Sequence, residues 1–210
     1  MKKFLFILVA AFISSTVGAQ VVTSTTYKKD KAKTVWYVKA GMNIANVSVD
    51  EGDGPDALIG YNVGIAFDRP IGGSGAFWSS GLQLATKGWK VSGEYEGYKE
   101  EVKFNANKLE LPLTFGYKYG INDDFAVDAR LGGFVNYDLF GKFKEKWGDE
   151  EESIDLGDIE DYDRLGAGIQ FGLGVWYQHF NLNISFQKGL IDQYEGMKEK
   201  NWMISLGYAF

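Results

Sequence analysis

The chain has 210 residues, a length that suits one domain of moderate size. It contains no cysteine, which excludes a disulfide framework, a thiol nucleophile and a lipidated cysteine. The net charge of −6 disfavours nucleic-acid binding, whereas 27 glycines, 16% aromatic residues and only three prolines favour a large antiparallel sheet.

The first 19 residues have the pattern of a cleaved signal peptide. MKK is a positively charged start, and the apolar run from Phe4 to Ile13 is about half the ~20 residues that a membrane-spanning helix needs. Small residues at Val17 and Ala19 predict cleavage before Gln20, so we expect residues 1–19 to be removed on export. Loss of Lys2 and Lys3 would take the net charge from −6 to −8. A transmembrane anchor is the alternative reading of this segment.

Residues 20–34 are polar and unpatterned, and we expect a flexible leader there. The folded domain is predicted to cover residues 35–210. Eight segments in it alternate apolar residues with polar or small ones, at 35–44, 59–67, 77–89, 109–119, 125–137, 165–175, 180–187 and 202–210. Such period-two patterns are typical of strands, and an even number suits a closed antiparallel membrane barrel.

The composition of the two strand faces predicts which one points outward. The apolar face carries aromatic residues near the strand ends, as in the aromatic girdles of a lipid-facing surface. The opposite face is mostly Gly, Asn, Ser and Gln, which fit a narrow interior. We therefore expect the apolar face to meet lipid. A secreted, lipocalin-like soluble binder of a small apolar ligand, with this face turned inward, is the alternative.

The connections alternate in length. They are short after the second, fourth and sixth segments, and longer after the others, at 48–57, 90–106, 141–163 and 188–200. Outer-membrane barrels have short periplasmic turns and long extracellular loops. The sequence thus predicts an all-β fold, an eight-stranded antiparallel up-and-down transmembrane β-barrel located in the outer membrane.

Several stretches resemble the PorT-like outer-membrane β-barrel family of Bacteroidetes-type Gram-negative bacteria. They are YVKAGMNIANV in the first strand, QLATKGWKV in the third, LELPLTFGYKYG in the fourth, the glycine-rich sixth strand and the terminal LGYAF. The resemblance covers about residues 35–210 and implies a barrel scaffold. One branch of the family is implicated in protein secretion, and nothing in these residues selects that branch.

Charged residues on the predicted inner face are the main candidate site. They are Lys39, Lys87, Glu110, Lys118, Asp128 and Arg130. Because buried charges are stable only when paired, we expect a structural network of ion pairs that fills the lumen. A proton or ion path is the alternative, which the narrow interior of an eight-stranded barrel disfavours.

The segment from Lys142 to Asp163 holds ten acidic residues against three lysines, and DEGDGPD at 50–56 is similarly acidic. Neither matches an EF-hand loop, so we expect solvated surface loops. Divalent cations bridging the longer loop to lipopolysaccharide or to a partner are the alternative.

The sequence offers few residues that could act in catalysis. The single histidine, His179, lies in a predicted short turn, and no G-x-S-x-G motif is present. We expect no enzyme activity, cofactor or metal. An outer-membrane hydrolase or acyltransferase built on carboxylates is a further alternative.

The predicted function is structural, or binding and interaction at the cell surface. The predicted partners are outer-membrane lipid and lipopolysaccharide, the barrel assembly machinery, and an unidentified surface or secretion partner, with no nucleic acid.

The chain ends on an aromatic strand, with Tyr208 and Phe210 on its apolar face. A final aromatic residue resembles the carboxy-terminal signal that the outer-membrane assembly machinery recognises. We predict that deletion of Phe210 lowers the amount of assembled barrel in the outer membrane, measured by the shift in gel mobility between unboiled and boiled samples. Unchanged levels would contradict this role.

Overall fold

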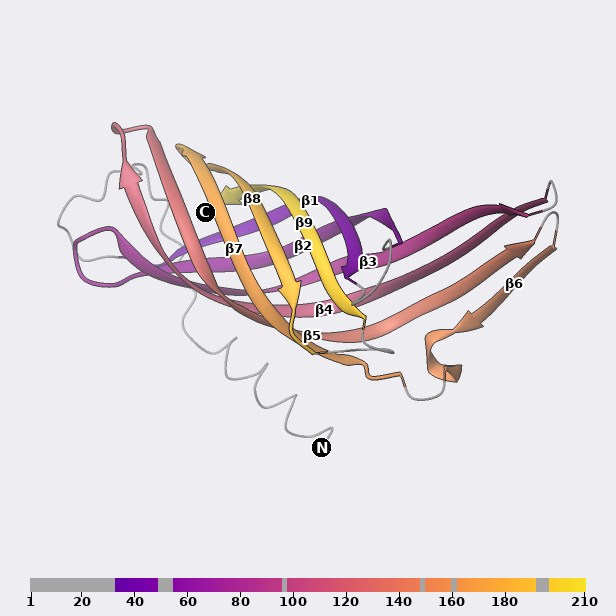
Figure 1. Ribbon diagram of the computed structural model, residues 1–210. Coiled ribbons are helices and arrows are strands. Elements are labelled where there is room, and N and C mark those ends of the chain that lie inside the picture. Colours follow the sequence, from indigo (N-terminus) through magenta and orange to yellow (C-terminus); the bar gives the residue numbers. More distant parts are fainter. Residues whose placement is uncertain (1–32, 49–54, 96–97, 148–149, 160–161, 192–196) are drawn as a thin grey trace.

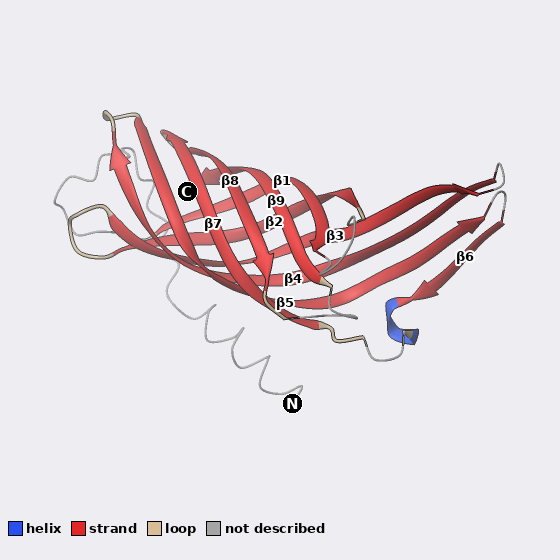
Figure 2. Ribbon diagram, viewed as in Figure 1, coloured by secondary structure: helices blue, strands red, loops and turns tan. Residues whose placement is uncertain are grey.

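The computed structural model describes residues 33–48, 55–95, 98–147, 150–159, 162–191 and 197–210. The predicted signal peptide, most of the leader and most of the acidic stretch 50–56 lie outside the described residues. The described chain forms nine strands and one short 3-10 helix, η1 at Leu156–Asp158 (Figures 1 and 2). The strands are β1 Val35–Ser48, β2 Asp56–Pro70, β3 Ala76–Tyr95, β4 Tyr98–Gly120, β5 Phe125–Trp147, β6 Glu150–Asp155, β7 Leu165–Tyr177, β8 Phe180–Gly189 and β9 Lys198–Ala209.

Eight of these strands close into a ring. The pairing order is β4-β3-β2-β1-β9-β8-β7-β5, and β4 also pairs with β5. All pairs are antiparallel, including β1 with β9, which joins the first strand to the last from Tyr37↔Ala209 to Ser48↔Lys198. β6 lies outside the ring, where it pairs with β5 from Lys142↔Asp155 to Trp147↔Glu150. The eight predicted strands and their up-and-down order are confirmed.

The apolar face points outward. On β4, Leu113 and Phe115 are 47% and 60% exposed, whereas Thr114 between them is 2% exposed. The same alternation runs along β7 and β9. An apolar surface of this extent is stable against lipid and unfavourable in water. The lipocalin-like alternative, which needs the apolar face inside, does not fit this arrangement.

Aromatic residues cluster on the outer surface where the strands end. Phe67 packs between Trp36 and Trp78, with ring centroids 4.9 Å from each. Phe125 and Tyr177 lie 5.1 Å apart on neighbouring strands. These rings form an aromatic band at one end of the strands.

One end of the ring, here the short-turn end, carries tight connections. They are Ile71–Gly75, Ile121–Asp124 and the pair Gln178–His179. Gly72 and Gly75 have φ values of 67° and 94°, and Gln178 has 51°. The left-handed region suits glycine, and it allows the chain to reverse within a few residues. The opposite end is here the long-loop end.

The prediction of long loops at 90–106 and 141–163 is largely wrong. β3 and β4 remain paired to Tyr95↔Tyr98, and β5 continues to Trp147 before β6 returns beside it. In Figure 1 these strands extend well past β1, β8 and β9 on the right. We name β3 from Val91, β4 up to Lys103, β5 from Lys142 and β6 the projecting sheet.

The physical reason for this error is the loss of burial beyond the ring. Apolar and polar residues alternate along a strand when one face of the sheet is buried, and most of the projecting sheet has no buried face. Polar contacts between neighbouring strands stand in its place, with Lys144 Nζ 2.5 Å from Glu151 Oε1 and Lys142 Nζ 3.7 Å from Asp155 Oδ1. A polar stretch of this kind has the composition of a loop.

Two glycines of β7 leave room for long side chains of β5. A Cβ atom at Gly168 would lie 2.7 Å from the Phe134 ring, and one at Gly174 would lie 2.4 Å from Asp128 Oδ2. The glycine-rich strand therefore makes the lumen wide enough for the inward side chains of its neighbour.

In the part of the chain that the structure describes, no helix is long and apolar enough to cross a membrane.

Candidate functional site

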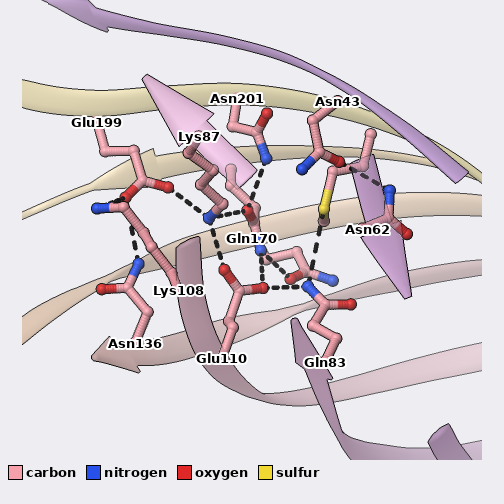
Figure 3. A network of polar contacts seen from close by, with 12 residues as sticks. Asn43, Asn62, Gln83, Lys87, Lys108, Glu110, Asn136, Gln170, Glu199 and Asn201 are labelled. Atoms are coloured by element: carbon pink, nitrogen blue, oxygen red, sulfur yellow. Dashed lines mark hydrogen bonds and ion pairs between the residues drawn. The ribbon is translucent and has the colours of Figure 1, made fainter. Parts of the chain in front are cut away.

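Two polar networks fill the described lumen at different heights. The one nearer the short turns, here the turn network, contains Tyr37, Asp68, Lys118, Asp128, Arg130 and Trp176. The one nearer the long loops, here the mouth network, contains Lys87, Lys108, Glu110, Asp138, Gln187 and Glu199. Figure 3 shows most of the mouth network with neighbouring amide side chains.

The turn network balances two cations with two carboxylates. Arg130 contacts Asp128 at 2.8 Å and Asp68 at 3.5 Å, and Lys118 lies 3.4 Å from Asp68. Trp176 Nε1 donates a hydrogen bond of 2.6 Å to Asp128, and its ring faces Lys118 Nζ at 3.7 Å. Each buried charge therefore has an opposite charge within reach, which offsets its desolvation.

In the mouth network, Lys87 is the central residue and is 1% exposed. Its Nζ donates to Glu110 at 2.5 Å, to Gln187 at 2.8 Å and to Glu199. Its charge also lies 4.9 Å from the centre of the Phe134 ring. Three acceptors match the three donors of an ammonium group.

Glu199 joins this centre to a second lysine. Lys108 Nζ lies 3.2 Å from Glu199 and 3.1 Å from Asp138. Asn136 donates to the second oxygen of Glu199 at 3.2 Å. Three carboxylates thus contact two lysines in the mouth network, and the charge of the inward-pointing Lys39 also interacts with Glu110.

Several of these contacts cross the full width of the ring. Lys87 is on β3 and Gln187 on β8, four strands apart in either direction around the ring. The same separation applies to Lys108 on β4 with Glu199 on β9, and to Arg130 on β5 with Tyr37 on β1. Side chains from opposite walls therefore meet in the centre of the lumen.

Five of the six predicted lumen residues belong to these networks: Lys87 and Glu110 to the mouth network, and Lys118, Asp128 and Arg130 to the turn network. Lys39 also points inward, but it is half-buried and makes no hydrogen bond or ion pair with another described residue. Its charge interacts with Glu110 of the mouth network and Asp68 of the turn network.

Sequence reasoning missed four charged members: Asp68, Lys108, Asp138 and Glu199. Asp68, Lys108 and Asp138 lie one residue beyond the end of a predicted strand, and Glu199 lies three residues before one. Each keeps the inward alternation of its strand, since Asp68 lies two residues after Ala66 and Glu199 two residues before Asn201. Extending the alternation by one to three residues would have identified them.

A cavity of about 360 Å³ opens above the mouth network, at the long-loop end. Its floor includes Lys87, Lys108 and Glu199. Its walls are mainly apolar and come from β1, β3, β4 and β5, from β6 and the segment after η1, and from the residue before β9. They include Val47, Trp89, Phe104, Phe143, Ile154, Ile159, Tyr162 and Met197.

Three aromatic contacts order these walls. Trp89 and Phe104 stack with centroids 6.1 Å apart, and Phe143 meets Trp89 edge-on at 6.3 Å. Tyr162 packs on Phe104 at 5.8 Å, and its hydroxyl donates a hydrogen bond to Asp138. Burial, together with the neighbouring carboxylate, raises the pKa of the Tyr162 hydroxyl, so this bond is kept at neutral pH.

Other candidate groups show no comparable geometry. No group of three or more carboxylate or histidine side chains is placed to hold a metal ion in the described ranges. His179 lies in the β7–β8 turn and stacks on Tyr208 at 5.9 Å. Tyr208 and Phe210 are half-exposed on the outer face, and the Phe210 amide donates to the Trp36 carbonyl at 3.0 Å.

We predict that Lys87→Met destabilises the barrel by about 3 kcal/mol, because removal of one partner leaves buried carboxylates without their cation. The measurement is urea unfolding of the refolded barrel in detergent micelles, followed by tryptophan fluorescence. Lys188→Met, at an exposed lysine of β8, is the matched control. Addition of Glu110→Gln to Lys87→Met should restore part of the loss. Equal stability of the two single variants would contradict the central position of Lys87.

The family comparison agrees with this architecture. Residues 19–195 match the model of a family described as outer membrane protein beta-barrel domain. A comparison with curated proteins gave no match.

Among solved structures, the chain is similar to Ail, the attachment invasion locus protein of Yersinia pestis, with 17% identity and a TM-score of 0.40 over 85% of this chain and 99% of that one. It is also similar to Neisserial surface protein A, with 12% identity and a TM-score of 0.44 over 83% and 97%. A third is OprG from Pseudomonas aeruginosa, with 14% identity and a TM-score of 0.42 over 85% and 97%.

The family match covers most of the chain, and the closed ring with its apolar outer surface is what such a domain requires in lipid. The chain belongs to the outer membrane protein beta-barrel domain family and is located in the outer membrane.

Proposed function

We propose that this protein is a non-enzymatic barrel of PorT-like type, with a lumen closed by its polar networks, that presents a binding region at the cell surface. The observation that carries the closure is the set of contacts between opposite walls of the ring. Lys87 with Gln187 and Lys108 with Glu199 cross near the mouth, and Arg130 with Tyr37 crosses nearer the short turns.

These contacts across the ring favour a closed lumen rather than an open pore, for an electrostatic reason. An ion that entered the lumen would have to displace a lysine or arginine from carboxylates that it already contacts at 2.5–3.5 Å. The displaced charges would then be buried without a partner, at a cost of several kcal/mol. An ion path would instead show unpaired side chains along a water-filled channel.

The surface role is supported by the asymmetry of the two ends. In the described part of the chain, the connections at the short-turn end are all tight turns, whereas the long-loop end carries the projecting sheet and the cavity. Binding residues are usually held at loops and strand ends by a rigid scaffold. We place the long-loop end outside the cell, as the short periplasmic turns of outer-membrane barrels imply.

Closure of the lumen is tested by conductance. We predict that the purified barrel gives no stable open channel in a planar lipid bilayer at neutral pH, with a trimeric porin in the same membrane as the positive control. Leu206→Ala, on the lipid-facing side of β9, is the matched variant and should behave as the wild type. Reproducible ohmic steps from the wild-type barrel would overturn the proposed plug.

Orientation is tested by labelling, which is clean because the natural chain has no cysteine. We predict that Ser92→Cys, in the projecting sheet, reacts with a membrane-impermeant maleimide in intact cells. Ser74→Cys, exposed in the β2–β3 turn, should react only after the cells are permeabilised. The reverse pattern would place the binding region in the periplasm.

A further inference from the structure

The cavity above the mouth network combines three features that select one chemical class of ligand. Its volume of about 360 Å³ falls in the range of small-molecule sites. Its walls are aromatic and aliphatic, and its floor is charged. A ligand that fits must therefore have an apolar body and one polar end.

The pairing of the floor charges bears on the sign of that end. Both floor lysines are already occupied, since Lys87 contacts Glu110 and Glu199, and Lys108 contacts Asp138 and Glu199. An anionic group would have to compete with these carboxylates for the lysines. A cation instead meets Glu199, the one carboxylate of the three that lines the cavity.

The hydrogen-bonding groups below the floor also favour a donor over a further acceptor. The side-chain oxygens of Gln83, Asn136 and Asn201 are buried and accept no hydrogen bond from the described residues. Asn136 and Asn201 are bonded through their amide nitrogens to Glu199 and Gln187, so both belong to the mouth network. These three residues lie outside the cavity lining, and their free oxygens show that the network below the floor has more acceptors than donors.

The walls also favour a cation. Trp89, Phe104, Phe143 and Tyr162 bring four aromatic rings together around the cavity. Aromatic faces attract ammonium groups, and clusters of such rings are a known means of binding them. Ile154, Ile159 and Tyr162 of the wall belong to the segment 142–163, with ten acidic residues against three lysines, which attracts cations towards the mouth.

We infer that the mouth cavity binds a small organic cation, an amine or quaternary ammonium on an aromatic or alkyl body, with the charged end towards Glu199. The inference rests on the proposed function, because a closed lumen below the cavity makes it a binding site rather than the entrance of a channel. The apolar body contacts wall residues such as Trp89, Phe104 and Ile154.

A matched set of three probes tests the inference. 4-Phenylbutylamine, 4-phenylbutanol and 5-phenylpentanoate share one phenylbutyl body and differ in the charge of the end group. Isothermal titration into the barrel in lipid nanodiscs should show the amine binding about tenfold more tightly than the alcohol, and the carboxylate more weakly still. Equal affinities, or tightest binding by the carboxylate, would overturn the inference.

Variants locate the binding and separate it from partition into lipid. Trp89→Leu should weaken binding of the amine about fivefold or more, because it removes one aromatic face and keeps the cavity apolar. Trp202→Leu, at a half-exposed tryptophan on the outer face, should bind as the wild type. Glu199→Gln should reduce the preference for the amine over the alcohol, and heat-modifiability on gels confirms that each variant is folded.

The outcomes separate this inference from the proposed function. An equal response of Trp89→Leu and Trp202→Leu, or equal heat from empty nanodiscs, would mean that the probes enter lipid and would reject the site. Absence of amine binding with a non-conducting barrel defeats the ligand class and leaves the plug intact. Ohmic conductance defeats the plug whatever the probes do.

Discussion

The requirement that every backbone amide be paired determines this structure. A strand in lipid has no water to satisfy its N–H and C=O groups, so the sheet must close on itself. Closure is achieved by the β1–β9 pair, which joins residues from opposite ends of the folded domain, Tyr37 with Ala209. Once the ring is closed, the period of two in the strands fixes one face to lipid and the other to the lumen.

The narrow ring then constrains the lumen. Eight strands leave space for side chains only, so any charge that points inward must be neutralised by another within a few ångströms. The two networks satisfy this in different ways. The turn network has equal numbers of cations and carboxylates, whereas the mouth network keeps one extra carboxylate and lies beneath a cavity with aromatic walls.

The fold was predictable from sequence where burial differs between two faces. Leu109, Leu111 and Leu113 alternate with Glu110 and Pro112, and this pattern alone orients β4. The projecting sheet was not predictable, because side chains such as Lys144 and Glu151 are solvated, and the ion pair between them leaves no period in the sequence. Inward charges were found inside the predicted strands and missed at their ends, and the cavity depends on contacts between Phe104 and Tyr162 that no local pattern records.

The length of β5 has a mechanical consequence. A membrane-spanning strand needs about 9–11 residues, and β5 has 23, so about half of it continues past the apolar band. Its hydrogen bonds to β4 run almost without interruption across this boundary, with one register shift at Asn107/Lys108. The projecting sheet is therefore a continuation of the barrel wall and not a loop attached only at its two ends. A load applied at Trp147 is transmitted along the β4–β5 ladder to the residues around the mouth.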